Sequence, residues 1–194
     1  LDLFGRRLSN APAFLVKCFT EILSIEYLPD GVDFDIESLN ASEIIKEGNY
    51  QGTRIEFWAK LGQIREKMQV DIGFGDVVFP SAVRMQFPTL LELPAPEIQA
   101  YSVETVIAEK FHAMTQLGEL NSRMKDFYDL YNLLRPEKFD LTALPNAISE
   151  TFSARSTNIP SNPLFPPNFT TDPNRLRQWS AFLKKSRLES LDFG

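Results

Sequence analysis

The sequence has few of the residues on which several common chemistries depend. Its 194 residues include one cysteine, Cys18, and one histidine, His112. A lone cysteine excludes an internal disulfide. Because neither C-x-x-C nor H-E-x-x-H occurs, a zinc site is unsupported. G-x-G-x-x-G and G-x-x-x-x-G-K-[ST] are also absent, so the chain has neither a dinucleotide-binding fingerprint nor a P-loop.

Long apolar runs and excess positive charge are missing too. No stretch approaches the ~20 apolar residues that cross a bilayer, and the opening LDLFGRR lacks the pattern of a signal peptide. We therefore expect a soluble protein with no membrane partner. The 20 Lys and Arg against 26 Asp and Glu give a net charge of −6. This balance argues against a generally basic surface that coats nucleic acid but is compatible with a local basic cleft.

What is present is an ordinary globular composition, 43% hydrophobic and 24% charged. The length suffices for the core of one domain or of two small lobes. Strand patterns precede residue 96 and helix patterns follow it, with a proline-rich connector from Pro80 to Pro96 that we expect to lack regular structure. We therefore predict an α+β lobe over residues 1–96 and a helical lobe over residues 97–194.

The first lobe begins with weakly patterned segments. Leu1–Phe4 resembles the end of a strand, and an apolar face predicts a packing helix over residues 11–23, with Cys18 in the core. The acidic segment from Pro29 to Asn49 is predicted to be irregular, with a short strand at residues 33–35. The D-x-D there fits an exposed acidic edge better than a metal pair, because nothing nearby completes a coordination shell.

Two later strands are marked by clear alternation of apolar and polar residues. Residues 54–61 and 68–74 predict an antiparallel hairpin with one packed face and one open face, separated by a polar loop over residues 62–67. Asp71 belongs to the open face, beside glycines that leave room for the close approach of a ligand. An ordinary polar residue on a wet sheet face is an equally good interpretation of Asp71.

Residues 101–134 predict two helices joined by a turn near Gly118. Apolar residues recur at three- and four-residue spacing on the first helix, and Lys110 falls in the middle of this stripe. A desolvated ammonium group costs several kcal/mol unless an anion meets it. Asp126 and Asp129 on the second helix can supply that anion. Lys110 then either contacts a ligand or forms a purely structural ion pair. Asp126 is either a site residue or an acid in the first turn that the helix dipole favours.

The remaining helical pattern is less specific. His112 lies away from the apolar stripe and is predicted to face solvent rather than to act in catalysis. A third helix is expected around residues 141–152, and a last helix from Pro173, capped by Thr171 or Asp172. The last helix carries basic residues spread around its surface, which is typical of a solvated helix; contact with a phosphate backbone is the rarer alternative. They are Arg175, Arg177, Lys184, Lys185 and Arg187.

Three runs of this chain resemble the AbiEii/AbiGii family of nucleotidyltransferase toxins. They are QVDIGFGD, FPTLLELPAP and ETVIAEKFHAM…NSRMKDFYDLYNLL. The likeness covers about residues 1–135, and the joint spacing of E-K-x-x-A-M with S-R-x-K-D-x-x-D is fairly specific. The resemblance implies a polymerase-β-like α+β fold, with a mixed or antiparallel sheet and flanking helices, followed by a helical C-terminal lobe.

The resemblance also implies which residues act. Asp2 matches the second aspartate of the family's D-x-D, and Asp71 matches a further acidic residue on an adjacent strand, so these two are expected to bind Mg²⁺. Lys110 and Asp126 match the lysine and aspartate of the helical motifs, and Arg123 stands near them. The implied catalytic residues are Asp2, Asp71, Lys110 and Asp126, with Lys110 and Arg123 binding substrate in one pocket suited to a metal-bound triphosphate.

The activity implied by the resemblance is transfer of a nucleotide from an NTP to an RNA 3′ end, tRNA in particular. The expected cofactor is Mg²⁺, the expected partner is a cognate antitoxin protein, and the expected location is the cytoplasm. The family's glycine turn and first aspartate would lie before Leu1, which suggests an N-terminally incomplete member that is inactive without them. Two alternatives are a degenerate homologue that binds nucleotide, RNA or a partner without turnover, and, more weakly, a Mg²⁺-dependent phosphohydrolase.

Overall fold

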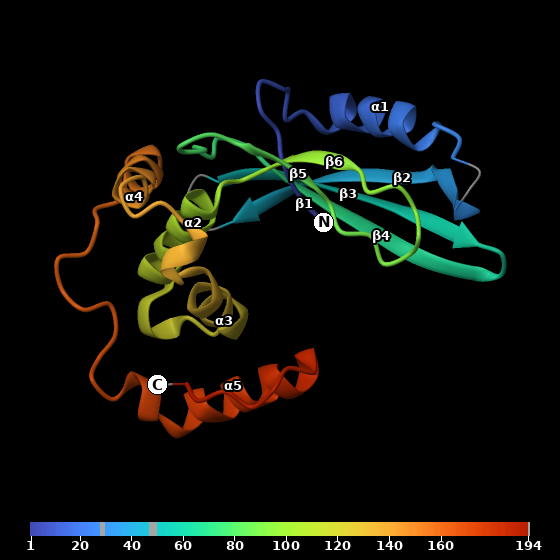
Figure 1. The fold of residues 1–194 in the computed structure, drawn as a ribbon. Helices are drawn as coiled ribbons and strands as arrows, with labels where there is room; N and C mark the ends of the chain where they lie inside the picture. The colour runs from blue at the N-terminus through green and yellow to red at the C-terminus, as the bar shows by residue number, and fades with distance from the viewer. Residues whose placement is uncertain (28–29, 47–49, 194) are drawn as a thin grey trace. The chain divides into compact units, whose positions relative to one another are not determined.

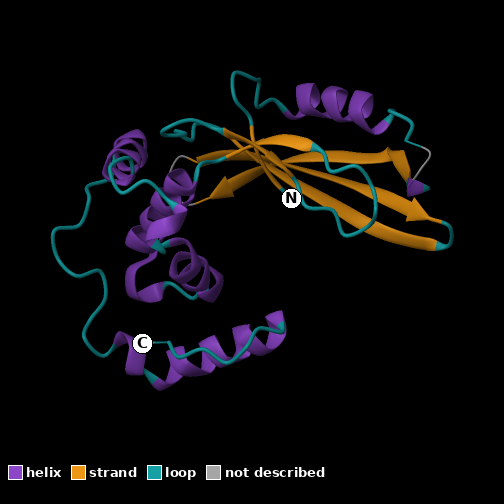
Figure 2. Cartoon of the chain, in the orientation of Figure 1, coloured by secondary structure: helices purple, strands orange, loops and turns teal. Residues whose placement is uncertain are grey.

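A computed structural model describes residues 1–27, 30–46 and 50–193. The chain divides into two compact units, Leu1–Asp76 and Val77–Gly194, which we call the first unit and the second unit. Strands dominate the first unit and helices the second (Figure 2), which confirms the predicted α+β class. The division falls after Asp76, so the segment from Pro80 to Pro96, which the sequence pattern assigns to the first lobe, belongs to the second unit.

The first unit is built on a mixed four-stranded sheet in the order β1–β4–β3–β2 (Figure 1). β1 (Asp2–Phe4) pairs in parallel with β4 (Ile64–Gly73). β4 pairs antiparallel with β3 (Tyr50–Leu61), which in turn pairs antiparallel with β2 (Asp33–Lys46). The helix α1 (Pro12–Leu23) packs against the sheet.

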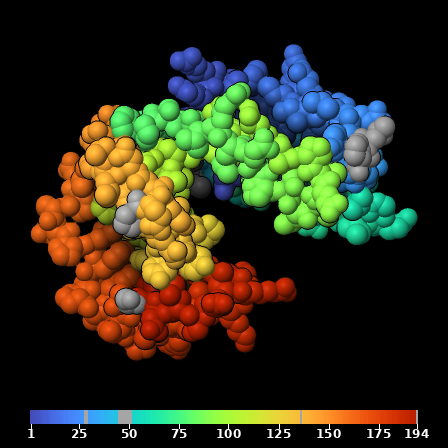
Figure 3. All heavy atoms as spheres, viewed as in Figure 1, coloured from blue at the N-terminus to red at the C-terminus, as the bar shows by residue number. Residues whose placement is uncertain are grey.

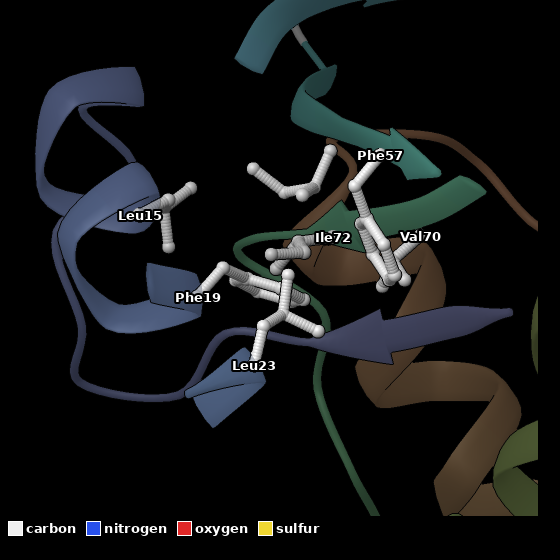
Figure 4. Packing of buried hydrophobic residues seen from close by; sticks show 7 residues of the cluster. Leu15, Phe19, Leu23, Phe57, Val70 and Ile72 are labelled. Carbon is white, nitrogen blue, oxygen red and sulfur yellow. The ribbon is translucent and has the colours of Figure 1, made fainter. Parts of the chain in front are cut away.

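The core of the first unit lies between α1 and one face of the sheet (Figure 4). Ile55 and Val70 are paired across β3 and β4, so their side chains point to the same face, as the alternation predicts. Leu15 and Phe19 of α1 cover that face. The buried members of this core are Leu15, Phe19, Leu23, Ile55, Phe57, Val70 and Ile72.

The acidic segment that precedes β3 is a long strand, so the prediction of irregular chain there was wrong. The register between β2 and β3 shifts between Asp35 and Asn40. Such a bulge interrupts the two-residue period, and the strand therefore could not be recognised from its alternation. Asp35 forms ion pairs with Lys60 and Arg65, which agrees with an acidic edge. Pro29 and residues 47–49 lie outside the described residues.

The predicted polar loop over residues 62–67 was also wrong, because β3 and β4 are joined by a two-residue turn. Leu61 is already paired with Ile64, and Gly62 has a positive φ of 57°. Glycine adopts such a φ without a steric cost, which permits the tight hairpin connection. Earlier in the chain, α1 begins at Pro12 without a side-chain cap, and Cys18 is half-buried rather than fully within the core.

The second unit contains a small antiparallel sheet and four α-helices. The strand β5 corrects the expectation that residues 80–96 lack regular structure. The prolines of residues 80–96 lie outside β5 and its partner strand β6, at positions where no backbone N–H is needed for the hydrogen bonds between strands. The elements are β5 (Val83–Gln86), β6 (Glu97–Ala100), α2 (Val103–Leu117), α3 (Met124–Leu133), α4 (Leu144–Ala154) and α5 (Pro173–Ser186).

The ends of the helices follow local signals in the sequence. The turn between α2 and α3 begins at Gly118, and Asp172 caps α5 by accepting hydrogen bonds from the backbone N–H groups of residues 174 and 175; both features were predicted. Ser102 caps α2 in the same way. Met124, Trp179 and Leu183 form a second core between α3 and α5. Within the described ranges, every helix is too short or too polar to cross a bilayer.

His112 is buried, and the prediction that it faces solvent was wrong. α4 packs against α2 and covers the side of that helix which carries His112. The His112 Nε2 lies 3.1 Å from the Oγ1 of Thr157, and the ring lies 5.0 Å from that of Phe152. Burial, assisted by the charge of Arg155, lowers the pKa of His112. A single amphipathic pattern could not show that a second helix covers the other side.

Replacement of Ile55 by alanine should destabilise the first unit. Ile55 is fully buried in the core, and Ile→Ala substitutions at such positions cost about 2–5 kcal/mol. The matched control is Ile64→Ala on the neighbouring strand, because Ile64 is 65% exposed and its loss should change the free energy of unfolding by about 0.5 kcal/mol or less. Urea denaturation of both variants measures the difference; equal losses would contradict the assignment of the core face.

The second unit should lose stability as the pH falls below about 6.5, the ordinary pKa of histidine. Because the folded state lowers the pKa of His112, the unfolded chain binds the proton first, and stability present at higher pH declines by at most about 1.4 kcal/mol per pH unit. Denaturation can be followed by Trp179 fluorescence in a Trp58→Phe background at pH 7.5 and 5.5. His112→Gln should reduce this decline; an unchanged decline would show that other groups cause it.

Candidate functional site

Asp2 and Asp71 lie next to each other on the sheet of the first unit. They are register partners on the parallel strands β1 and β4, so both project from the face opposite the core. The backbone N–H of Asp71 donates a 2.8 Å hydrogen bond to the carbonyl of Leu1, which fixes β1 beside β4 at this point. The structure therefore brings together the two carboxylates that were predicted to bind metal.

Asp71 is held by a cation from the next strand. Nε of Arg54 lies 2.8 Å from Oδ1 of Asp71, and Nη2 lies 2.9 Å from Oδ2, which is the paired geometry that arginine and carboxylate groups favour. Gln69 Nε2 lies 3.3 Å from both oxygens. The hydrogen bond to Asp71 raises the pKa of Arg54 further. Arg54 was missed in the sequence, although a two-residue turn places it directly opposite Asp71.

Asp2 and Asp71 offer two neighbouring carboxylates to a cation such as Mg²⁺. Carboxylate oxygens suit this hard cation, which is commonly held by one or two carboxylates together with phosphates and waters. In the described part of the chain, no cluster of three or more His, Cys, Asp or Glu side chains is arranged to hold a metal ion. Two carboxylates alone would leave the other ligands of Mg²⁺ to phosphate or water, and both oxygens of Asp71 are already bonded to Arg54.

The second unit holds a lysine between two aspartates. Nζ of Lys110 on α2 lies 2.7 Å from Oδ1 of Asp126 and 2.7 Å from Oδ2 of Asp129, both on α3. The three side chains are only 17%, 16% and 23% exposed, respectively. Lys125, one turn before Asp129, adds a 2.6 Å contact to the same Oδ2. The predicted pairing of Lys110 with these acids is confirmed, and their charges balance locally.

The pKa shifts agree with this balance. Burial acts most strongly on Lys110 and disfavours its charge, but the hydrogen bonds and charges of Asp126 and Asp129 together outweigh it, and the pKa of Lys110 is raised. Burial likewise opposes ionisation of Asp129, while Lys110 and Lys125 outweigh it and lower the pKa of that carboxyl group. Lys110 and Asp129 are therefore both charged at neutral pH.

A buried asparagine positions the start of α3. Asn121 is 0% exposed, and its Oδ1 accepts a 2.8 Å hydrogen bond from the backbone N–H of Arg123. Its carbonyl accepts a hydrogen bond from Arg175 of α5. These contacts fix the turn after α2, and the first turn of α3 then brings Asp126 to Lys110. Asn121 carries no chemical signal in the sequence beyond its place in a turn.

Arg123 lies beside this cluster, at the N-cap of α3. It is exposed and lines an open groove of about 620 Å³ between α3 and α5, and Asp126 lines the same groove. Thus three predicted residues, Lys110, Asp126 and Arg123, are brought together in the second unit, whereas Asp2 and Asp71 are brought together in the first. The first unit thus carries a pair of carboxylates, and the second unit carries cations beside an open groove.

Comparison with known proteins identifies one family. A family model described as "Nucleotidyl transferase AbiEii toxin, Type IV TA system" matches residues 1–193. This match extends beyond the predicted likeness over residues 1–135 and includes α4 and α5. Comparisons with curated proteins and with solved structures found no match.

Removal of the Lys110 charge should destabilise the second unit. Lys110→Met leaves two carboxylates facing each other in a half-buried setting, and we expect a loss of about 1–3 kcal/mol in the free energy of unfolding. The triple variant Lys110→Met, Asp126→Asn, Asp129→Asn removes that repulsion and should recover most of the loss. Urea denaturation measures both; a triple variant less stable than the single one would show that the acids contribute independently of the lysine.

Proposed function

The chain belongs to the AbiEii family of nucleotidyl transferase toxins of type IV toxin–antitoxin systems, and we propose that it transfers a nucleotide from an NTP to the 3′ end of an RNA, with tRNA as the acceptor. Membership of the family implies a nucleotide substrate and an antitoxin partner. The acceptor, the use of Mg²⁺ and the activity of this chain are the parts that we propose.

One observation carries the proposal: the Lys110 side chain, only 17% exposed, lies between Asp126 and Asp129. Ion pairs at such positions rarely repay the cost of desolvation through stability alone, because apolar side chains of similar size serve equally well. A lysine with its ammonium group oriented by two acids is suited to contact the phosphates of a nucleotide. We assign that role to Lys110, and we assign its orientation to Asp126.

In the proposed reaction the 3′-hydroxyl loses its proton to water and its oxygen forms a bond to the α-phosphorus of the NTP, while the bond from the α-phosphorus to the bridging oxygen breaks and pyrophosphate leaves. Catalysis of this step rests on positioning and on stabilising negative charge. Mg²⁺ held by Asp2 and Asp71 would supply positive charge at the triphosphate. Arg54 keeps the carboxylate of Asp71 in one orientation.

The second candidate is a homologue that binds nucleotide, RNA or a partner without turnover. The observation in its favour is that both oxygens of Asp71 are already bonded to Arg54, while Asp126 and Asp129 are bonded to Lys110. Closed ion-pair networks of this kind also occur as purely structural features. A measurement of nucleotide transfer to RNA distinguishes the transferase from the non-catalytic homologue.

The test is incubation of the protein with each α-³²P-labelled NTP, Mg²⁺ and total tRNA. We expect label in the RNA from one or more NTPs, and a loss of about 10²-fold or more in Lys110→Ala, because groups that stabilise developing charge contribute about that much. Lys184→Ala, which removes a lysine outside the cluster, is the matched control and should label normally.

The triple variant distinguishes a loss of activity from a loss of folding. If Lys110→Met, Asp126→Asn, Asp129→Asn melts like the wild type yet transfers no label, the cluster acts in the reaction. Persistent labelling by Lys110→Ala would make Lys110 a structural residue and would defeat the proposal. Label released only as free nucleotide would identify a phosphohydrolase, and nucleotide binding without any product would identify the non-catalytic homologue.

A further inference from the structure

The groove between α3 and α5 combines an apolar floor with a basic rim. Met124, Ala181 and Phe182 form the floor. Phe182 is half-buried and packs against Tyr128 and Trp179, with ring centroids 5.9 Å and 5.6 Å away. Such support holds an aromatic ring in place. The polar lining residues are Ser122, Arg123, Lys125, Asp126, Gln178 and Lys185.

The charge of the groove is positive although the chain as a whole carries −6. Arg123, Lys125 and Lys185 are exposed at its rim, and Asp126 is the one acidic residue of the lining. Asp126 is neutralised by its 2.7 Å contact with Lys110. Among the described residues, neither Arg123 nor Lys185 forms an ion pair with an acid. Two exposed cations without partners therefore flank an apolar surface.

We propose that this groove binds the single-stranded 3′ end of the acceptor RNA, an inference that rests on the proposed function. Single-stranded RNA is commonly bound by stacking of bases on aromatic side chains combined with phosphate contacts from lysine and arginine. Phe182 and its apolar neighbours provide the surface for a base, and Lys185 and Arg123 contact the phosphates. The volume of about 620 Å³ lies within the range of small-ligand sites and accommodates a nucleotide.

The position of the groove fits an RNA end. It begins at Arg123 and Asp126, beside Lys110, and extends along α5 to Lys185. Figure 1 shows α3 and α5 of the second unit, and Figure 3 shows the side chains of α5, in orange-red, at the surface. An open groove lined by cations from both α5 and the start of α3 suits a strand whose phosphates follow one another. An isolated triphosphate has the same phosphate chemistry, so the test must separate the two.

Lys185 offers a sharp test, because its neighbour Lys184 faces a different cavity, lined also by Leu188 and Phe193. Both lysines lie in the last turn of α5 and complement the helix dipole equally. Lys185→Glu and Lys184→Glu therefore change net charge, helix stability and long-range attraction by the same amounts. Only Lys185→Glu alters the groove.

The measurement is fluorescence anisotropy of a labelled single-stranded RNA with a free 3′-hydroxyl, titrated with the whole protein at several salt concentrations. Lys185→Glu should raise the Kd about 3- to 10-fold and lower the salt slope of log K by about 0.7 for each phosphate that the protein no longer neutralises. Lys184→Glu should stay within about twofold of the wild type. Lys185→Arg should retain binding, and thermal melting should confirm that both glutamate variants fold.

Several outcomes would overturn the inference. Equal weakening by Lys184→Glu and Lys185→Glu would mean that only the overall field attracts RNA. An unchanged RNA Kd in Lys185→Glu together with weaker NTP binding would assign the groove to the triphosphate. The proposed function fails differently: a wild-type protein that binds RNA through Lys185 but transfers no label refutes the transferase reaction and leaves the groove as an RNA site.

Discussion

The ion pairs of Lys110 with the carboxylates of Asp126 and Asp129 fix how α2 and α3 meet in the second unit. Asp126 and Asp129 both belong to α3, and the charge of Lys110 of α2 can be accommodated away from water only if α3 presents these acids to it. The turn after Gly118 and the buried Asn121 are arranged so that the first turn of α3 meets this requirement. The same contacts place Arg123 at the mouth of the groove.

In the first unit, backbone pairing between strands, and not side-chain charge, positions the acidic residues. The short turn at Gly62 aligns β3 with β4 so that Arg54 stands opposite Asp71, and the parallel pairing of β1 puts Asp2 on the other side of Asp71. The ladder therefore fixes the aspartate pair before any ligand is present. Rigid placement of this kind favours a site whose groups need little reorganisation.

Much of this arrangement could be predicted from the sequence. Helical periodicity identified Lys110 as out of place in an apolar stripe, and the second helix of the hairpin offered Asp126 and Asp129 as its partners. Arg54 could not be found in the same way, because its role depends on a register set by the length of one turn. The burial of His112 could not be predicted, because the apolar pattern on one side of a helix contains no information about a helix that packs on its other side. The bulge in β2 and the prolines around β5 concealed those two strands.

The hairpin of β3 and β4 has a consequence for how this sequence can vary. Side chains alternate between the two faces of a sheet, so an extra residue at Gly62 would put every β4 side chain on the wrong face if the turn kept two residues and no bulge formed. Asp71 would then be turned into the apolar core and Val70 out into water. The pairing of Arg54 with Asp71 therefore survives an added residue at that tip only where a bulge or a longer loop absorbs it.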